Sequence, residues 1–157
     1  MISEAKRLTA KNCILVSACL LGENCKYNGG NNYNQKLVDF LEDKTFLAVC
    51  PEVAGGLPTP RAPVEIYQGH VYDKRGHVYD QEFHQGIERV LSKIDDMEID
   101  LAILQPRSPS CGVHHIYDGR FSGKTIAGQG LFARKLIDLG HDVIDVDDLS
   151  QLVKGKR

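Results

Sequence analysis

The chain has 157 residues, of which 42% are hydrophobic and 25% charged, and its formal net charge at pH 7 is −2. These values are typical of a globular protein, so we expect one domain over residues 1–157, with a polar N-terminal extension at residues 1–12. The lack of a basic run argues against extended nucleic-acid binding, and the lack of a long apolar stretch argues against a secretion signal or a membrane span. We therefore expect a soluble, cytoplasmic protein.

Four short apolar segments predict β-strands. Each is a nearly continuous apolar run rather than an alternating one, which is typical of strands covered on both faces. The predicted strands span residues 13–17, 46–49, 101–104 and 143–146.

Segments with helical spacing lie between these strands. The first places apolar residues on one face over residues 37–41. The second runs from Asp80, a candidate N-cap, to Ile94. The third covers residues 131–139, and Gly140 is expected to end it in a left-handed turn.

The alternation of strands and helices predicts the fold class. It indicates an α/β fold with a mainly parallel sheet and right-handed crossovers, that is, a Rossmann-like three-layer sandwich. The segment at residues 66–79 contains β-branched and aromatic residues around two glycines. It is compatible with either a small hairpin or a surface excursion.

Three of the five cysteines fall where strands are predicted to end. Cys19 lies just past the first strand, Cys50 ends the second, and Cys111 follows the third after a short loop. Ligands of open parallel sheets bind beyond the carboxyl ends of the strands, so these thiols are expected to meet there. In a reducing cytosol, metal binding or catalysis explains cysteines better than disulfides do, and a cysteine-only set favours zinc, copper(I) or an iron–sulfur cluster.

The other two cysteines are interpreted differently. Cys13 lies at the far end of the first strand, so it is expected to be a small buried apolar side chain. Cys25 lies in a loop that can fold back over the site. Loop packing or support of a ligand is favoured for it over a place as fourth ligand.

Several motifs in the same order resemble the DUF523 family, whose characterised member is a bacterial thiouracil desulfurase. The resemblance covers most of the chain, from Ser17 to about Gly140, and Tyr27-Asn28-Gly29 departs from an expected tyrosine-aspartate-glycine. The matching segments are Ser17-Ala18-Cys19-Leu20-Leu21-Gly22, Cys50-Pro51-Glu52, Gly55-Gly56-Leu57, Pro60-Arg61 with Pro63 and Glu65, Ser108-Pro109-Ser110-Cys111-Gly112, Ile116-Tyr117-Asp118-Gly119 and Phe121-Ser122-Gly123.

This resemblance implies a cofactor, a reaction and a set of site residues. It implies a 4Fe–4S cluster held by Cys19, Cys50 and Cys111, with one iron open to the substrate sulfur. It also implies that Glu52 and Ser108 are catalytic. The implied reaction replaces the sulfur of a thiolated nucleobase, such as 2-thiouracil, with oxygen from water and releases hydrosulfide.

Structural alternatives stand beside these assignments. Glu52 has the alternative of an exposed or Arg61-paired carboxylate, and Ser108 that of a turn serine. Arg61 and Gly22 are expected to contact the substrate, although a structural pair between Arg61 and Glu65 is as well supported for the arginine.

Other residues near the third cysteine carry weaker signals. Of His114 and His115, at most one is expected to face the site. Gly123, Gly128 and Gly130 match neither a dinucleotide-binding nor a Walker pattern, so we interpret them as close-packing glycines that can also admit a nucleobase or a phosphate.

Three alternatives to a free-base desulfurase remain open. In the first, the desulfurase acts on a thiolated nucleoside, nucleotide or transfer RNA, although the weak net charge disfavours a large RNA. Alternatively, the protein is a non-catalytic metal- or cluster-binding protein in which Cys25 completes a closed site. A cysteine-nucleophile hydrolase ranks last, because no cysteine–histidine arrangement is visible in the sequence.

Overall fold

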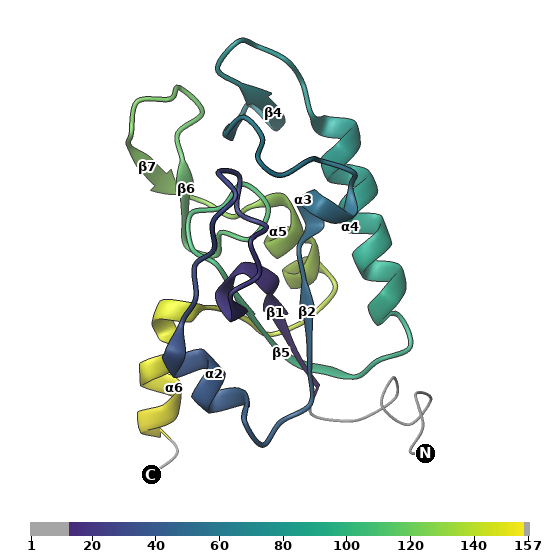
Figure 1. Ribbon diagram of the computed structural model, residues 1–157, viewed down its shortest axis with the longest axis vertical. Coiled ribbons are helices and arrows are strands. Elements are labelled where there is room, and N and C mark those ends of the chain that lie inside the picture. The colour runs from purple at the N-terminus through teal and green to yellow at the C-terminus, as the bar shows by residue number, and fades with distance from the viewer. Residues whose placement is uncertain (1–12, 156–157) are drawn as a thin grey trace.

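The computed structural model describes residues 13–155; the predicted extension at residues 1–12 lies outside the described residues. Four strands form a parallel sheet in the order β2–β1–β5–β8 (Figure 1). The first two predicted strands are confirmed to the residue, β5 begins two residues earlier than predicted, and β8 ends one residue earlier. Their bounds are Cys13–Ser17 for β1, Phe46–Val49 for β2, Ile99–Leu104 for β5 and Val143–Asp145 for β8.

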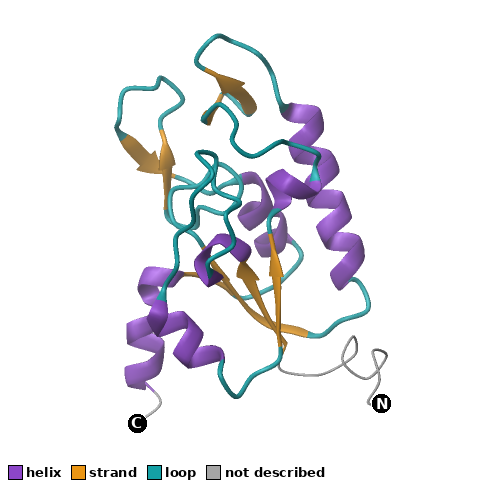
Figure 2. Ribbon diagram, in the orientation of Figure 1, coloured by secondary structure: helices purple, strands orange, loops and turns teal. Residues whose placement is uncertain are grey.

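Helices cover both faces of this sheet, which confirms the predicted three-layer α/β architecture (Figure 2). Successive strand residues point to opposite faces. Ile14 and Val16 therefore pack with α2 (Gln35–Leu41) and α6 (Leu149–Gly155). Leu15, between them, packs on the other side with the apolar residues of α4 (Asp80–Ile94) and α5 (Leu131–Asp138).

The strand order places a switch point beside β1. The chain leaves β1 through α2 to reach β2, whereas it leaves the neighbouring strand β5 through α5 to reach β8 on the opposite side. Because these two connections diverge, the carboxyl ends of β1 and β5 border a crevice, the usual ligand site of such sheets.

The helix boundaries correct one prediction. Asp80 is not the N-cap of α4; Tyr79 precedes the helix and Asp80 is its first residue. The Asp80 carboxylate instead accepts the Val71 N–H at 2.7 Å and pairs with His70 Nδ1 at 2.6 Å, so it joins the helix to a neighbouring strand. The left-handed turn at the end of α5 is confirmed, with a φ of 92° at Gly140.

Two antiparallel hairpins stand above the carboxyl edge of the sheet (Figure 1). The first pairs β3 (Val64–Tyr67) with β4 (His70–Asp73), which resolves the open choice for residues 66–79 in favour of a hairpin. The second pairs β6 (His115–Tyr117) with β7 (Thr125–Ala127) and was not predicted. Across the described part of the chain, no helix is long and apolar enough to cross a membrane.

Candidate functional site

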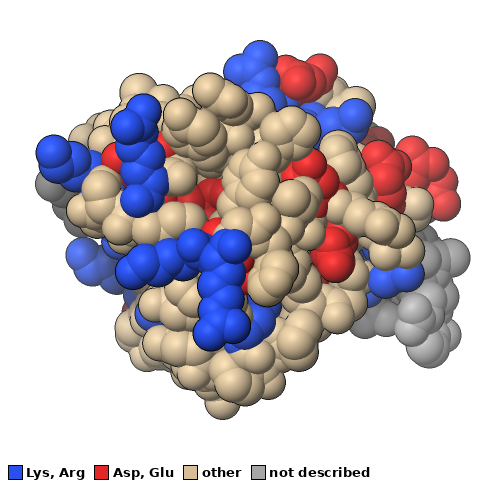
Figure 3. Space-filling view, turned by 90° about the horizontal axis from the view of Figure 1, so that it is seen from above, with Lys and Arg blue, Asp and Glu red and all other residues tan. Residues whose placement is uncertain are grey.

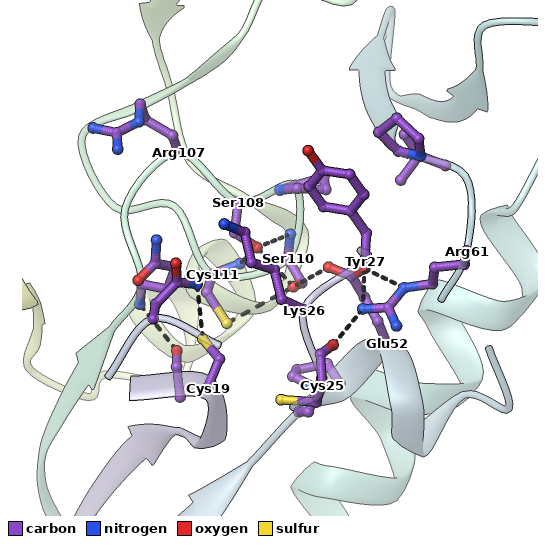
Figure 4. Close-up of a pocket in the computed structure, with 18 of the residues that line it drawn as sticks. Cys19, Cys25, Lys26, Tyr27, Glu52, Arg61, Arg107, Ser108, Ser110 and Cys111 are labelled. Carbon is purple, nitrogen blue, oxygen red and sulfur yellow. Dashed lines mark hydrogen bonds and ion pairs between the residues drawn. The ribbon is translucent and has the colours of Figure 1, made fainter. Parts of the chain in front are cut away.

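A cavity of about 570 Å³ opens at the carboxyl ends of the strands, below the two hairpins (Figure 4). Its wall is built from loops that are far apart in sequence. The residues with thiol or charged side chains or a serine hydroxyl on that wall are Ser17, Cys19, Cys25, Lys26, Cys50, Glu52, Arg61, Glu65, Lys74, Arg107, Ser108, Ser110 and Cys111.

Each predicted cysteine reaches this cavity from the segment that follows a strand of the sheet. Cys19 lies in a 3₁₀ turn, η1 (Ala18–Leu21), that directly follows β1. Cys50 follows β2 and is the N-cap of the short helix α3 (Pro51–Ala54). A proline is favourable in the first turn of this helix, because the backbone N–H that proline lacks would have no partner within the helix. Cys111 follows β5 after a loop. The predicted meeting of these three cysteines is therefore observed at one cavity.

The loop that carries Cys111 is fixed against the start of α5. The Ser110 carbonyl accepts the N–H groups of Phe132 and Ala133 at 2.9 and 3.1 Å. Gly130 lets the two segments approach, since a Cβ there would lie 2.6 Å from the Ser110 carbonyl carbon. This glycine was interpreted correctly as a close-packing residue.

Cys25 folds back over the site, and its side chain is only 8% exposed. Its thiol lies within hydrogen-bond reach of Cys19 and Cys50. The hydrogen bond from Cys25 lowers the pKa of Cys19 and lowers that of Cys50 to about 7, whereas the same contacts raise the pKa of Cys25 itself. The proton is therefore held more strongly by Cys25 than by its two neighbours, which suits support of ligands.

Cys111 lies deeper than the other two predicted ligands. Burial raises the pKa of its thiol to about 12, although hydrogen bonds from the Ser17 and Ser110 side chains act in the opposite direction. Loading a metal onto this thiol at neutral pH must therefore release a proton. Cys13 is fully buried at the start of β1, as predicted for a core residue.

Glu52, the first residue after Pro51 in α3, is held by two partners. Its Oε1 accepts hydrogen bonds from Arg61 Nε at 3.2 Å and Nη2 at 3.1 Å, and its Oε2 accepts one from Ser110 Oγ at 2.9 Å. The ion pair is largely buried, with side-chain exposures of 8% for Arg61 and 12% for Glu52. Glu52 thus forms the predicted structural pair and lines the cavity as well.

Arg61 does not pair with Glu65, so that alternative is wrong. The Arg61 Nη2 also donates to the Cys25 carbonyl at 2.9 Å, which ties the Cys25 loop to the Glu52 helix. Glu65 instead accepts the N–H groups of Gly119 and Phe121 at 3.0 and 3.1 Å. This contact joins the β3–β4 hairpin to the loop that follows β6.

Ser108 combines a turn role with a place on the cavity wall. Its Oγ accepts the N–H groups of Ser110 and Cys111 at 3.1 and 3.0 Å, as a turn serine does. The same oxygen lies 3.0 Å from Ser110 Oγ. The dashed lines of Figure 4 show how the Ser110 hydroxyl reaches Glu52.

Sequence reasoning gave no role to several polar residues of this wall, among them Lys26, Lys74, Arg107 and Ser110. Lys26, Lys74 and Arg107 come from three separate loops, and no local pattern marks them. Figure 3, which looks onto the hairpin end of the molecule, shows Lys and Arg side chains gathered on part of that face. Ser110 had a signal, since it directly precedes Cys111 in a motif singled out from the sequence.

Several other predicted residues lie away from the cavity. Gly22 does not line it but ends the η1 turn with a φ of 95°, so its substrate contact stays a prediction. Neither His114 nor His115 lines it; His114 Nε2 pairs with Asp148 Oδ2 at 2.7 Å beside a second cavity of about 350 Å³. Gly123 lies on the wall of the main cavity.

The donors of the main cavity fit an iron–sulfur cluster by their chemistry. Four thiols line one space, and thiolates are the ligands that such clusters prefer. Within residues 13–155, no group of three His, Cys, Asp or Glu side chains is arranged to hold a single metal ion.

Comparison with known proteins agrees with the geometry. The profile of the 2-thiouracil desulfurase family matches residues 14–148. The chain is 34% identical over 150 residues to the uncharacterized protein YbbK of Bacillus subtilis (strain 168), covering 89% of this chain and 99% of YbbK. The solved structure of the [4Fe-4S]-dependent thiouracil desulfidase TudS superimposes with a TM-score of 0.84 at 41% identity, covering 92% of this chain and 97% of TudS. The chain therefore belongs to the 2-thiouracil desulfurase family.

Proposed function

We propose that this protein is a 4Fe–4S-dependent desulfurase that converts a thiolated nucleobase, such as 2-thiouracil, and water into the oxygen-containing base and hydrosulfide. One observation carries this proposal: cysteine thiols from three strand ends and the carboxylate of Glu52 line the same cavity. Family membership supports the same reaction.

The proposed ligands are Cys19, Cys50 and Cys111. With three cysteine ligands, a bound cluster supplies one Lewis-acidic iron, which suits the soft sulfur of a thiocarbonyl. Cys25 is assigned the supporting role described above, because hydrogen bonds to the proposed ligands Cys19 and Cys50 raise the pKa of its thiol.

Glu52 is the proposed general base. A carboxylate has about four lone-pair sites, of which Arg61 uses two on Oε1 and Ser110 one on Oε2. The remaining site on Oε2 is free to take a proton from water as that water attacks the thiocarbonyl carbon. The two partners fix the carboxylate, so little reorganisation accompanies this step.

Ser108 is the second proposed catalytic residue, and its Oγ lies 3.0 Å from the Ser110 hydroxyl that donates to Glu52. Arg61 lines the cavity and holds Glu52, and direct contact between its guanidinium and the substrate stays a prediction.

A second candidate substrate, a thiolated nucleoside or nucleotide, is favoured by the positive charges of Lys26, Lys74 and Arg107. Their charges lie on the wall of a cavity with room beyond a single base, where a phosphate group would be attracted.

The first test measures iron and acid-labile sulfide per chain after anaerobic reconstitution. Wild type and Cys25→Ser are expected to bind about four irons, and Cys19→Ser, Cys50→Ser and Cys111→Ser to lose them. Iron retained in Cys25→Ser would also argue against the alternative in which Cys25 completes a closed, non-catalytic site. Tightly held zinc in place of iron would contradict the proposal.

The second test follows uracil and hydrosulfide production from 2-thiouracil by the reconstituted protein. Glu52→Gln is expected to keep its iron and lose turnover by at least 100-fold, in line with the usual contribution of a general base. Full turnover in this variant would remove Glu52 from the mechanism. Glu42→Gln, an exposed carboxylate at the end of α2, is the matched control.

A further inference from the structure

Ser110 is a buried polar residue that contacts the proposed general base. It is only 2% exposed, and its hydroxyl lies within hydrogen-bond distance of the Ser108 hydroxyl and of the Glu52 carboxylate, the two proposed catalytic groups. The Oγ atom is 3.0 Å from Ser108 Oγ and 2.9 Å from Glu52 Oε2. A hydroxyl at this position completes a continuous chain from Ser108 to Glu52.

The direction of this chain follows from counting donors and acceptors. A serine hydroxyl has one proton to donate and two lone pairs. Both lone pairs of Ser108 Oγ are occupied, by the N–H groups of Ser110 and Cys111. Ser108 therefore acts as a donor, and the acceptor at hydrogen-bond distance is Ser110 Oγ.

Ser110 then directs its own proton to Glu52. Two acceptors compete for it: the Glu52 carboxylate oxygen at 2.9 Å and the Cys111 sulfur at 3.7 Å. The shorter bond to a carboxylate is the stronger one, because hydrogen bonds to charged acceptors are about twice as strong as neutral ones. Ser17 supplies another hydroxyl to the Cys111 sulfur, so that sulfur does not depend on Ser110.

We propose that Ser110 is a positioning residue, which holds the Glu52 carboxylate in its working orientation and couples it to Ser108. Arg61 fixes one carboxylate oxygen and Ser110 fixes the other, so the remaining lone pair keeps one direction. Ser108 strengthens this hold, because a hydroxyl that accepts a hydrogen bond donates a stronger one. The inference rests on the proposed function of Glu52 as general base.

The backbone around Ser110 is built to keep this geometry. The Ser110 carbonyl is held by the first turn of α5, and Gly112 donates its N–H to the Ser108 carbonyl at 2.9 Å. The hydroxyl therefore sits on a rigid support, as a positioning group requires.

The kinetic test uses the reconstituted enzyme with 2-thiouracil. Ser110→Ala is expected to lower kcat by about 10- to 100-fold, the usual effect of losing a hydrogen bond to a charged group, with KM nearly unchanged. Ser110→Thr keeps the hydroxyl and is expected to recover most of the loss. Iron per chain and thermal unfolding, measured on the same samples, separate this effect from loss of cluster or fold.

Double variants test the coupling itself. Ser108→Ala is expected to cost clearly less in a Ser110→Ala background than in wild type, because the coupling has already been broken. Likewise, Ser110→Ala is expected to cost nothing further in a Glu52→Gln background. Additive losses in both pairs would overturn the proposal, whatever the outcome with threonine.

A spectroscopic measurement keeps the inference testable without turnover. The infrared band of the Glu52 carboxylate, identified by its loss in Glu52→Gln, is expected to shift in Ser110→Ala and to stay in place in the control variant Glu42→Gln. An unshifted band in Ser110→Ala would overturn the inference. A shifted band in a protein without desulfurase activity would support the Ser110 contact and contradict only the proposed function.

Discussion

A substitution on helix α4 tests how tightly the fold positions the site. Gly86 of α4 faces α3, the helix that begins after Cys50 and carries Glu52. A Cβ at Gly86 would overlap the Pro51 carbonyl oxygen and lie 2.8 Å from the Gly55 nitrogen, whereas ordinary contacts begin at 3.4 Å. Gly86→Ala therefore forces α3 away from α4.

Two opposing effects set the expected stability of this variant. Helix propensity alone favours alanine over glycine by about 1 kcal/mol. Overpacking of a close contact costs about 1–3 kcal/mol, and here the overlap is with backbone that has no rotamer to change. We expect the steric effect to win, with a net loss of about 1–2 kcal/mol in the free energy of unfolding.

The effect on the site is expected to exceed the effect on stability. Relief of the overlap moves α3 by roughly 1 Å, and a misplacement of that size costs about 100-fold in rate when it reaches a catalytic group. Urea unfolding, iron per chain and turnover of 2-thiouracil measure the three consequences. Gln85→Ala, on an exposed position of the same helix, is the control and should match wild type.

The opposite result would refute this reasoning. A Gly86→Ala protein that is more stable than wild type, with unchanged iron content and turnover, would show that propensity dominates. The close approach of α3 and α4 would then not position Glu52.

Three further predictions concern the cysteines, a surface histidine and a packed glycine. In the cluster-free protein, alkylation of Cys50 should rise through pH of about 7, because the hydrogen bond from Cys25 lowers the pKa of Cys50. In Cys25→Ala, which removes this donor, the profile should shift to higher pH, and an unshifted profile would contradict this. The hydrogen bond to Asp148 raises the pKa of His114, so this pair stabilises the fold below the unfolded pKa of histidine, and the effect disappears as pH rises through the raised value. His114→Gln should therefore lower the free energy of unfolding in urea by about 0.5 kcal/mol near pH 5.5 and leave it unchanged near pH 9. An equal loss at both pH values would exclude the ion pair as its cause. Gly130→Ala should displace the Ser110 carbonyl, since its Cβ would lie 2.6 Å from the carbonyl carbon, and should lower both the melting temperature and the iron content. Unchanged values would show that the loop can shift without loss of stability or iron.

The sequence by itself determined the layers of this protein and the edge at which its chemistry lies. Apolar runs such as Cys13–Ser17 identify buried strands through local composition, and the alternation with helices makes the sheet parallel. A parallel sheet brings the carboxyl ends of its strands to one edge, so Cys19, Cys50 and Cys111 could be expected to meet without knowledge of any loop. Motif resemblance indicated the family.

Only the tertiary structure decided which side chains pair within that edge. Arg61 had two acidic candidates, Glu52 nine positions before it and Glu65 four positions after it, and the fold of the loops around them selected the more distant Glu52. Asp80 could have capped its own helix, yet its carboxylate bonds to β4 because the hairpin packs beside the helix start. Such choices differ little in local energy, so long-range packing settles them.

The link from Ser110 to Glu52 depends most strongly on the complete fold. Fifty-eight residues separate the two side chains, and a bond of 2.9 Å joins them because β2 and β5 flank β1 and deliver their following loops to the same crevice. Local patterns carry no information about contacts of this length, since such contacts depend on strand order and on the conformation of every loop between. The sequence thus located the chemistry, and the packing of loops from separate strands oriented its groups.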